Sequence, residues 1–338
     1  MRDWALRCRK TAFAVTWMLH DLVVLTCFGS LPQLGNQMTW RIGAVSYLNT
    51  KPLIYGLEKH LPDAELILDL PSRLADRLAV GELDVALIPS VEFLRGRGLT
   101  IISDACIACC GPVRSVRVLF RKPPSEVKTL ALDEGSRTSA ALAQVLLAER
   151  FGVHPVRQQL DINAVIDECA ADAILVIGDR AMSLNLGAYC ESWDLGEEWL
   201  RETGLPFVFA MWVARKTALP DISEALQQAR DAGLANLNDI IATEAPKYGL
   251  SATSCEEYFR RHLHFYLGQR ELAGLQLFSK HAESLALISK TLPLQPGRIK
   301  SVERLSSTVL PKGNGSKSTR IFPADENVQV SQRAFRND

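Results

Sequence analysis

Short apolar runs alternate with amphipathic stretches along most of the chain. Residues 42–45 and 84–88 are almost wholly apolar, which is typical of strands buried on both faces of a parallel sheet. Residues 71–80 place Leu74 and Leu78 on one helical face behind an initial proline, and Gly81 marks the end of this predicted helix. Further strands are predicted at residues 64–70, 100–106, 116–121, 129–132, 156–160, 173–177 and 207–214. The alternation predicts an α/β fold with parallel sheets.

The order of these elements suggests two lobes. Residues 41–120 form a first α/β block, residues 121–208 a second, and helices dominate the rest. If the strand at 207–214 returns to the first lobe, that lobe also takes residues 209–290. Among the helices, one is predicted at residues 52–60, and the patterns Asp221 to Glu224 and Ser254 to Glu257 fit an N-terminal capping box.

The two ends of the chain differ from the rest. Residues 1–37 have a basic start and an apolar middle that His20 and Asp21 interrupt, whereas a membrane span needs about 20 clean apolar residues. We expect translation to start at Met38, with a signal peptide as the alternative. Residues 295–338 are polar and lack periodicity, which predicts a disordered tail, with a partner-binding segment as the alternative.

Composition and charge exclude some function classes. The chain has 47% hydrophobic and 22% charged residues, and Lys plus Arg (38) balance Asp plus Glu (38). The basic excess of a nucleic-acid-binding protein is therefore missing. Cys106, Cys109 and Cys110 have no partners at metal-ligand spacing, so we expect reduced thiols on a buried strand, with a metal or redox site as the alternative. Reduced thiols suggest the cytoplasm.

Polar residues gather beside the predicted strands, where open α/β sheets bind ligands. Tyr47 and Asn49 follow the first strand, and Ser90 follows residues 84–88. Ser115 precedes its strand, so it can join the same edge only as part of a hinge or if that strand is antiparallel. The remaining clusters are residues 133–139 and the group Gly178, Asp179 and Arg180.

Three hydroxyl groups crowd the start of one predicted helix, those of Ser136, Thr138 and Ser139. Free N–H groups and the helix dipole favour an anion there, although Ser136 as a simple N-cap is the alternative. Arg137 could add charge or point to solvent. Asn49 offers a donor and an acceptor to a substrate hydroxyl, but Asn in a turn and Asp179 as a helix cap are ordinary alternatives.

Several common catalytic signals are missing from the sequence. It contains no G-x-G-x-x-G, P-loop or H-E-x-x-H pattern, and its six histidines lie outside the polar clusters. Hydride transfer, phosphoryl transfer and zinc hydrolysis therefore lose their usual signatures. A histidine base is not expected.

Six sequence blocks, in order, resemble one family. The blocks are IGAVSYLNTKPL, GELDVALIPSVEFL, ISDACIACCGPVRSVRVLF, ALDEGSRTSAALAQVLL, ADAILVIGDRA and TGLPFVFAMWVARK. They are similar to the chorismate dehydratases of the futalosine route to menaquinone, from about residue 41 to 216 and more loosely to 288. The sister 1,4-dihydroxy-6-naphthoate synthases share the fold but open with a cysteine-proline-asparagine type of turn, where this chain has SYLNTKPL.

The resemblance implies a two-lobed, type II periplasmic-binding-protein-like fold with a ligand cleft between the lobes. It implies a cytoplasmic lyase that removes water from chorismate to give 3-[(1-carboxyvinyl)oxy]benzoate, with no metal, cofactor, nucleic acid or membrane partner. Asn49 and Ser115 match its catalytic residues, and Ser136, Thr138 and Ser139 match a carboxylate-binding helix start. We add as further substrate-binding residues Tyr47, Ser90, Gly178 and Asp179. No feature indicates the oligomeric state.

A function from another class stays open. A solute-binding protein for a small carboxylate, exported by residues 1–37, would share the fold and the anion-binding helix start. It would not need Asn49 together with Ser115, because capturing a carboxylate requires neither. That pair therefore favours the enzyme.

Overall fold

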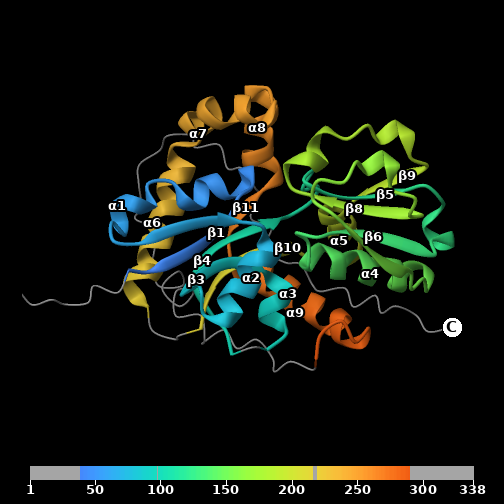
Figure 1. The fold of residues 1–338 in the computed structure, drawn as a ribbon, viewed down its shortest axis with the longest axis horizontal. Helices are drawn as coiled ribbons and strands as arrows, with labels where there is room; N and C mark the ends of the chain where they lie inside the picture. Colours follow the sequence, from blue (N-terminus) through green and yellow to red (C-terminus); the bar gives the residue numbers. More distant parts are fainter. Residues whose placement is uncertain (1–38, 97, 216–218, 290–338) are drawn as a thin grey trace, which may run out of the picture. The chain divides into compact units, whose positions relative to one another are not determined.

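The computed structural model describes residues 39–96, 98–215 and 219–289 of the 338-residue chain. Within this part, two β-sheets lie in one compact unit (Figure 1). The predictions for residues 1–37 and 295–338 fall outside the described residues and stay predictions.

The first sheet has six strands in the order β11-β4-β10-β3-β1-β2. β1 pairs parallel with β2 and β3, as predicted, whereas β10 inserts antiparallel between β3 and β4. Residues 207–214 thus join the sheet that contains β1, and their antiparallel direction makes this sheet mixed rather than parallel. The bounds are β1 Arg41–Val45, β2 Glu65–Asp69, β3 Val85–Pro89, β4 Thr100–Cys109, β10 Phe207–Ala214 and β11 His264–Tyr266.

The second sheet has five strands in the order β7-β6-β8-β5-β9. β5 pairs antiparallel with β8 and β9, so residues 116–120, which we expected in the first α/β block, belong to the second sheet. The chain crosses between the sheets at Ser115, just before β5. Because β5 runs antiparallel to β8, its first residue, Val116, lies beside the last residue of β8, Ile177. The bounds are β5 Val116–Phe120, β6 Thr129–Asp133, β7 Val156–Leu160, β8 Ala173–Ile177 and β9 Glu191–Asp194.

The helices follow the predicted pattern with local exceptions. α2 covers the predicted range and ends at Gly81, whose φ of 84° a glycine adopts freely. The helix predicted at 52–60 is a 3₁₀ turn, η1 (Leu48–Ile54), followed by a short α1, because Gly56 interrupts it at a φ of 66°. The bounds are α1 Leu57–His60, α2 Pro71–Val80, α3 Ser90–Leu94, α4 Thr138–Phe151, α5 Leu195–Thr203, α6 Pro220–Ala235, α7 Leu237–Glu244, α8 Ala252–Glu257 and α9 Gln269–Ser284.

Both predicted capping boxes are wrong. α6 begins at Pro220 without a side-chain cap. α8 begins three residues earlier than Cys255, and its cap is Ser251, whose side chain accepts a hydrogen bond from Ser254 N. A capping pattern alone does not locate a helix start, because several nearby hydroxyl residues can satisfy the same N–H groups.

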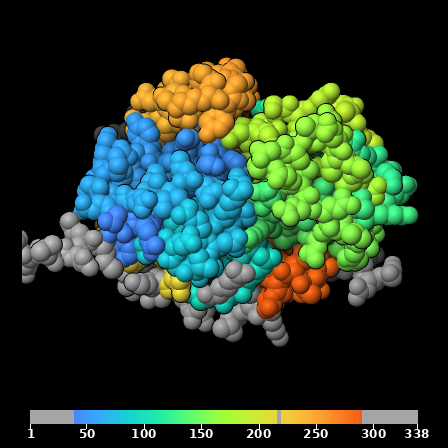
Figure 2. Space-filling model, in the orientation of Figure 1, coloured from blue at the N-terminus to red at the C-terminus, as the bar shows by residue number. Residues whose placement is uncertain are grey.

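The core supports the predicted burial of the central strands. Every residue of β3 and of β10 is buried, and one buried cluster includes residues of both sheets. Cys106 and Cys109 are buried on β4, as expected, whereas Cys110 is exposed just beyond it. In the space-filling view the surfaces of the β1–α3 region, blue to cyan, and of the second sheet, green, meet along a seam (Figure 2).

Candidate active site

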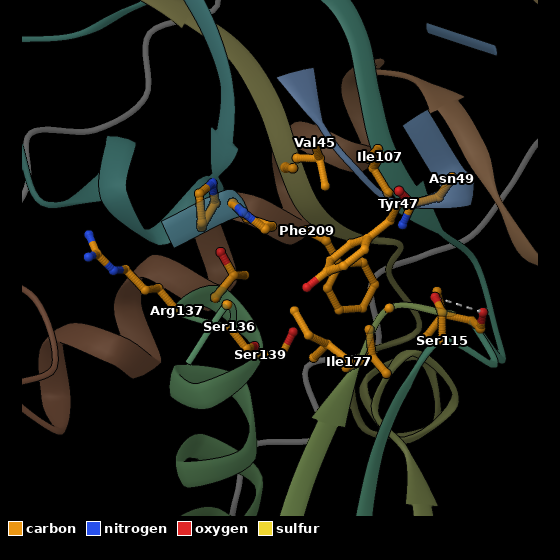
Figure 3. A pocket seen from close by; sticks show the side chains of 18 residues that line it. Val45, Tyr47, Asn49, Ile107, Ser115, Ser136, Arg137, Ser139, Ile177 and Phe209 are labelled. Carbon is orange, nitrogen blue, oxygen red and sulfur yellow. Dashed lines mark hydrogen bonds between the residues drawn. The ribbon is translucent and has the colours of Figure 1, made fainter. Parts of the chain in front are cut away.

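A pocket lies where loops of the two sheets meet. Its apolar wall includes Val45, Ile107, Ile177 and Phe209 (Figure 3). Its polar lining residues are Tyr47, Asn49, Ser115, Ser136, Arg137, Thr138 and Ser139. The pocket thus collects most of the residues proposed from the sequence, including Gly178, which also lines it. Ser90 and Asp179 do not line it.

The start of α4 forms one side of the pocket and carries no side-chain cap among the described residues. The N-cap position is Arg137, so Ser136 is not the N-cap. The Ser136 hydroxyl is buried and has no hydrogen-bond partner in the part of the chain that is described. The first N–H groups of a helix also lack intrahelical acceptors. This end of the pocket therefore offers unpaired donors to an anion.

Thr138 and Ser90 join α4 to the first sheet behind the pocket. The Thr138 Oγ1 atom accepts a hydrogen bond from Val91 N at 3.2 Å. Ser90 Oγ donates to Val208 O at 2.7 Å and lies 3.4 Å from Thr138 Oγ1. Ser90 is fully buried, so its hydroxyl contributes to this junction and not to the pocket surface.

Tyr47 extends across the pocket from the loop after β1. Its hydroxyl points toward the start of α4 (Figure 3) and, like that of Ser136, is buried without a partner among the residues described. Burial, followed by the charge of Asp133, raises the pKa of Tyr47 well above its ordinary value. The neutral phenol can donate a hydrogen bond to an oxygen of a bound ligand.

Asp179 holds the Tyr47 loop from the second sheet. Its Oδ1 atom accepts a hydrogen bond from Leu48 N at 3.1 Å. Burial raises the pKa of Asp179 to about 6, against a smaller opposing effect of the Leu48 hydrogen bond. Asp179 therefore fixes the loop that carries Tyr47 and Asn49.

Ser115 contacts Tyr258, a residue that the sequence did not point to. Tyr258 donates a hydrogen bond to Ser115 Oγ at 2.8 Å. Tyr258 follows α8 as one of many apolar positions of the helical C-terminal part. No local sequence signal distinguishes it from an ordinary core tyrosine.

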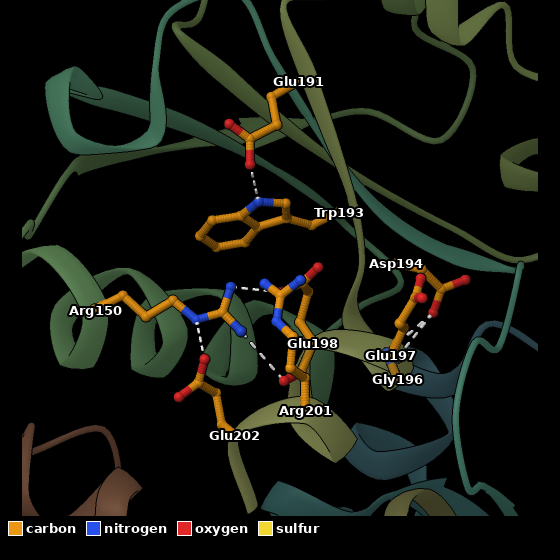
Figure 4. Close-up of polar contacts among 9 residues, drawn as sticks. All are labelled: Arg150, Glu191, Trp193, Asp194, Gly196, Glu197, Glu198, Arg201 and Glu202. Carbon is orange, nitrogen blue, oxygen red and sulfur yellow. Dashed lines mark hydrogen bonds and ion pairs between the residues drawn. The ribbon is translucent and has the colours of Figure 1, made fainter. Parts of the chain in front are cut away.

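Asp194 positions the segment that carries Ser115, and it too was missed. It caps α5 by accepting from Gly196 N and Glu197 N (Figure 4). The same carboxylate accepts from Val113 N at 2.8 Å and Arg114 N at 2.6 Å. An acidic residue before a helix predicts a cap, but its second role depends on contacts 81 and 80 residues away.

Arg137 does not direct its charge into the pocket. Its Nη2 atom lies 2.6 Å from Asp76 Oδ2, and its Nη1 atom lies 3.2 Å from Glu92 Oε1. Figure 3 shows its side chain leading away from Tyr47 and Ser115. The question that the sequence left open is therefore answered by ion pairs to α2 and α3.

The pocket has a distinct chemical character. None of the described residues that line it is Asp, Glu, His or Lys. In the described ranges, no group of three or more His, Cys, Asp or Glu side chains could hold a metal ion. Within those ranges, no helix combines the length and apolar character that crossing a membrane requires. The pocket offers hydrogen-bond donors and apolar contacts to its ligand.

Comparison with known structures identifies the fold. A protein from Archaeoglobus fulgidus aligns with a TM-score of 0.60 at 16% identity, covering 75% of this chain and 100% of that one. The alkanesulfonate-binding protein of Xanthomonas axonopodis aligns at 0.58 and 17%, covering 76% and 96%. The periplasmic aliphatic sulphonate-binding protein of Escherichia coli aligns at 0.53 and 16%, covering 86% and 98%. The predicted periplasmic-binding-protein-like fold is confirmed.

Sequence comparison identifies the family. The chorismate dehydratase of Thermus thermophilus is 28% identical over 265 residues, which cover 73% of this chain and 95% of the relative. That of Campylobacter jejuni is 27% identical over 252 residues, covering 72% and 98%. Both confirm the resemblance carried by the six sequence blocks. A sequence model described as menaquinone biosynthesis matches residues 40–284, and this chain therefore belongs to the menaquinone biosynthesis family.

Proposed function

We propose that this chain is a chorismate dehydratase, a hydro-lyase that converts chorismate into 3-[(1-carboxyvinyl)oxy]benzoate and water. Two chorismate dehydratases are relatives that it matches over nearly their whole length. The proposal includes a cytoplasmic location, which cell fractionation would test. It needs no cofactor, because the reaction is an elimination without change of oxidation state.

The side chains that line the pocket are the observation that best supports this proposal. Asn49 and Ser115 lie across it from the start of α4, which offers unpaired donors to a carboxylate. Chorismate has two carboxylates, a ring hydroxyl and an apolar ring face. The hydroxyl-rich helix start suits a carboxylate, the apolar wall suits the ring, and the Asn49–Ser115 side suits the ring hydroxyl.

The reaction balances without an external reagent. A ring C–H bond beside the hydroxyl-bearing carbon breaks, its electron pair forms the third double bond of the ring, and the C–O bond breaks. The departing hydroxide takes up one proton and leaves as water. The product is aromatic, so the reaction is downhill, and the protein has to bind, orient and assist the proton movement.

None of the described lining residues is an Asp, Glu, His or Lys that could accept the ring proton. We propose that one carboxylate of the substrate itself accepts it, while hydrogen bonds from Asn49 and Ser115 stabilise the departing oxygen. A large loss of turnover on replacing a single Asp or Glu that leaves binding intact would contradict this assignment.

The proposal is tested by incubating the purified protein with chorismate. We expect loss of the cyclohexadiene absorbance and a product whose mass is lower by one water. Asn49→Ala and Ser115→Ala should each lower kcat by about 100-fold, the usual effect of removing one donor to a developing negative charge. The controls are Asn163→Ala, in an exposed turn after β7, and Ser223→Ala, in α6. Tight binding without turnover would instead support a solute-binding protein.

A further inference from the structure

Tyr258 occupies an unusual place for a core tyrosine. It is 1% exposed and begins a π-helical turn, Tyr258–His262, that follows α8 directly. Single π turns are uncommon and often occur at functional sites. The turn brings the Tyr258 hydroxyl to Ser115, 143 residues earlier in the chain, at 2.8 Å.

The hydrogen bond between Tyr258 and Ser115 has a defined direction. A phenol has a single proton, and Tyr258 donates it to Ser115 Oγ. Burial raises the pKa of Tyr258 well above its ordinary value, so the phenol stays protonated and remains a donor.

This hydrogen bond determines where Ser115 can direct its own proton. Tyr258 donates its proton to one of the two lone pairs of Ser115 Oγ, so the serine's own O–H points elsewhere and is available as a donor. The acceptor within reach among the described residues is Val113 O, at 3.5 Å, the outer limit of a hydrogen bond. An oxygen of a bound ligand at a normal distance would be a better acceptor.

We propose that Tyr258 is a positioning residue that makes Ser115 a hydrogen-bond donor toward the substrate, because the Tyr258 hydroxyl occupies one acceptor position of the serine. This inference rests on the proposed function and adds a third residue to its Asn49–Ser115 pair.

The π-helical turn is held to the crossing segment by other contacts as well. His262 Nδ1 lies 2.8 Å from Pro112 O, and Arg114 forms an ion pair with Glu257 at 3.6 Å. Removing the hydroxyl of Tyr258 therefore leaves the turn attached, so Tyr258→Phe tests the hydrogen bond and not the docking of the turn.

The test is a double-mutant cycle with chorismate as substrate. Tyr258→Phe should lower kcat by about 10-fold and change KM by less than about 3-fold, because the serine loses its fixed orientation while the substrate contacts remain. In the Ser115→Ala background the same change should have almost no further effect, because Tyr258 acts through Ser115.

A control separates this role from stability. Phe259→Leu alters the neighbouring buried ring of the same turn, whose centroid lies 5.8 Å from that of Tyr258, without removing a polar atom. It should lower the melting temperature and leave kcat at 25 °C unchanged. If the kcat losses of Tyr258→Phe and Ser115→Ala multiply in the double variant, the proposed role of Tyr258 is overturned and the proposed function is not. If the wild-type protein shows no turnover, the proposed function and this inference are overturned together.

Discussion

At the scale of single residues, two glycines give Tyr47 its place in the pocket. Gly178 has a φ of 73° and a ψ of −158°, a region that glycine alone occupies readily. A Cβ atom added there would lie 2.9 Å from the Tyr47 ring, and one added at Gly135 would lie 2.9 Å from the Tyr47 hydroxyl oxygen. The tyrosine reaches the start of α4 because neither neighbour has a side chain.

Gly178→Ala should therefore weaken substrate binding. The added methyl group displaces Tyr47, and we expect KM to rise by about 10-fold or more, in line with the cost of a misplaced binding group. The matched control is Gly152→Ala, where φ is 65° but an added Cβ meets nothing within 4 Å among the described residues. It should lower the stability by about 1 kcal/mol, the cost of placing alanine in the left-handed region, and leave KM unchanged. Equal KM values for the two variants would argue against this account of Tyr47.

Asp179→Asn tests the buried carboxylate through the pH dependence of stability. Burial raises the pKa of Asp179 from 3.8 to about 6, so the folded protein holds this proton more tightly than the unfolded chain. The resulting stabilisation is fully present below pH 3.8 and is lost as the pH rises through 6. The amide variant avoids burying the charge and can still accept from Leu48 N.

We expect Asp179→Asn to exceed the wild type in free energy of unfolding by about 2 kcal/mol at pH 8, the order given by a shift of this size. The difference should shrink as the pH falls from 7 to 4. Urea unfolding curves across this range measure it. A difference that grows toward acid pH would show that the charged form of Asp179 stabilises the fold.

At the scale of elements, Arg150 joins α4 to α5 and so supports the helix whose start lines the pocket. Its guanidinium lies 5.0 Å from the centre of the Trp193 ring. It also pairs with Glu198 and, at 2.7 Å, with Glu202 (Figure 4). Glu198 is 5% exposed, so losing this partner leaves a buried carboxylate with less compensation.

Arg150→Met should lower the free energy of unfolding by about 2 kcal/mol. Breaking a buried ion pair costs several kcal/mol in general, and Arg201, which also pairs with Glu198, reduces that loss. Arg157→Met, on exposed β7, should cost less than about 0.5 kcal/mol. Both variants should keep the wild-type KM at 25 °C, because α4 stays folded. A raised KM for Arg150→Met would show that the start of α4 depends on this contact.

At the scale of the whole described unit, polar contacts connect elements of the two sheets around the pocket. Arg137 pairs with Asp76 and Glu92, and Arg73 lies 2.7 Å from Glu134. Asp179 accepts from Leu48 N. Closure over a ligand excludes water from such a site, and these contacts stabilise the arrangement in which the pocket is complete.

Arg137→Leu should raise KM about 3- to 10-fold and leave kcat nearly unchanged, because ion pairs of this exposure contribute about 1 kcal/mol and the side chain leads away from Tyr47 and Ser115. The effect should be smaller at 0.5 M salt, which screens the pairs in the wild type. Arg260→Leu, whose partner Glu256 lies four residues away, is the control. A fall in kcat of about 100-fold would mean that Arg137 contacts the reacting substrate after all.

Much of the fold could be predicted because fully buried segments have an apolar composition. β3 and β10 are buried throughout, so their sequences are uninterrupted apolar runs. β9 and β11 were not predicted, because they are short, partly exposed edge strands with polar residues such as Glu191 and His264. Hydrogen bonding to a neighbouring strand defines them, and their own composition does not.

The residues of the candidate site also fall into those that the sequence indicated and those that it did not. Polar residues at strand ends marked Tyr47, Asn49 and the start of α4, because parallel strands bring such ends to one edge. Tyr258 and Asp194 gave no such signal, since each acts on the Ser115 segment through a contact far away in the chain. Ser90 had the expected sequence context, yet its hydroxyl is used to join β10 and α4.

The sequence by itself determined most of the buried strands and the longer helices, and which loops carry polar groups, because periodicity and burial act locally along the chain. Only the tertiary structure decided that Ser136 is no cap, that Arg137 turns to acidic partners, and that Tyr258 donates to Ser115. The reason is physical: whether a donor is free, and in which direction a hydroxyl points its proton, depends on neighbours that the folded chain alone brings within hydrogen-bond distance.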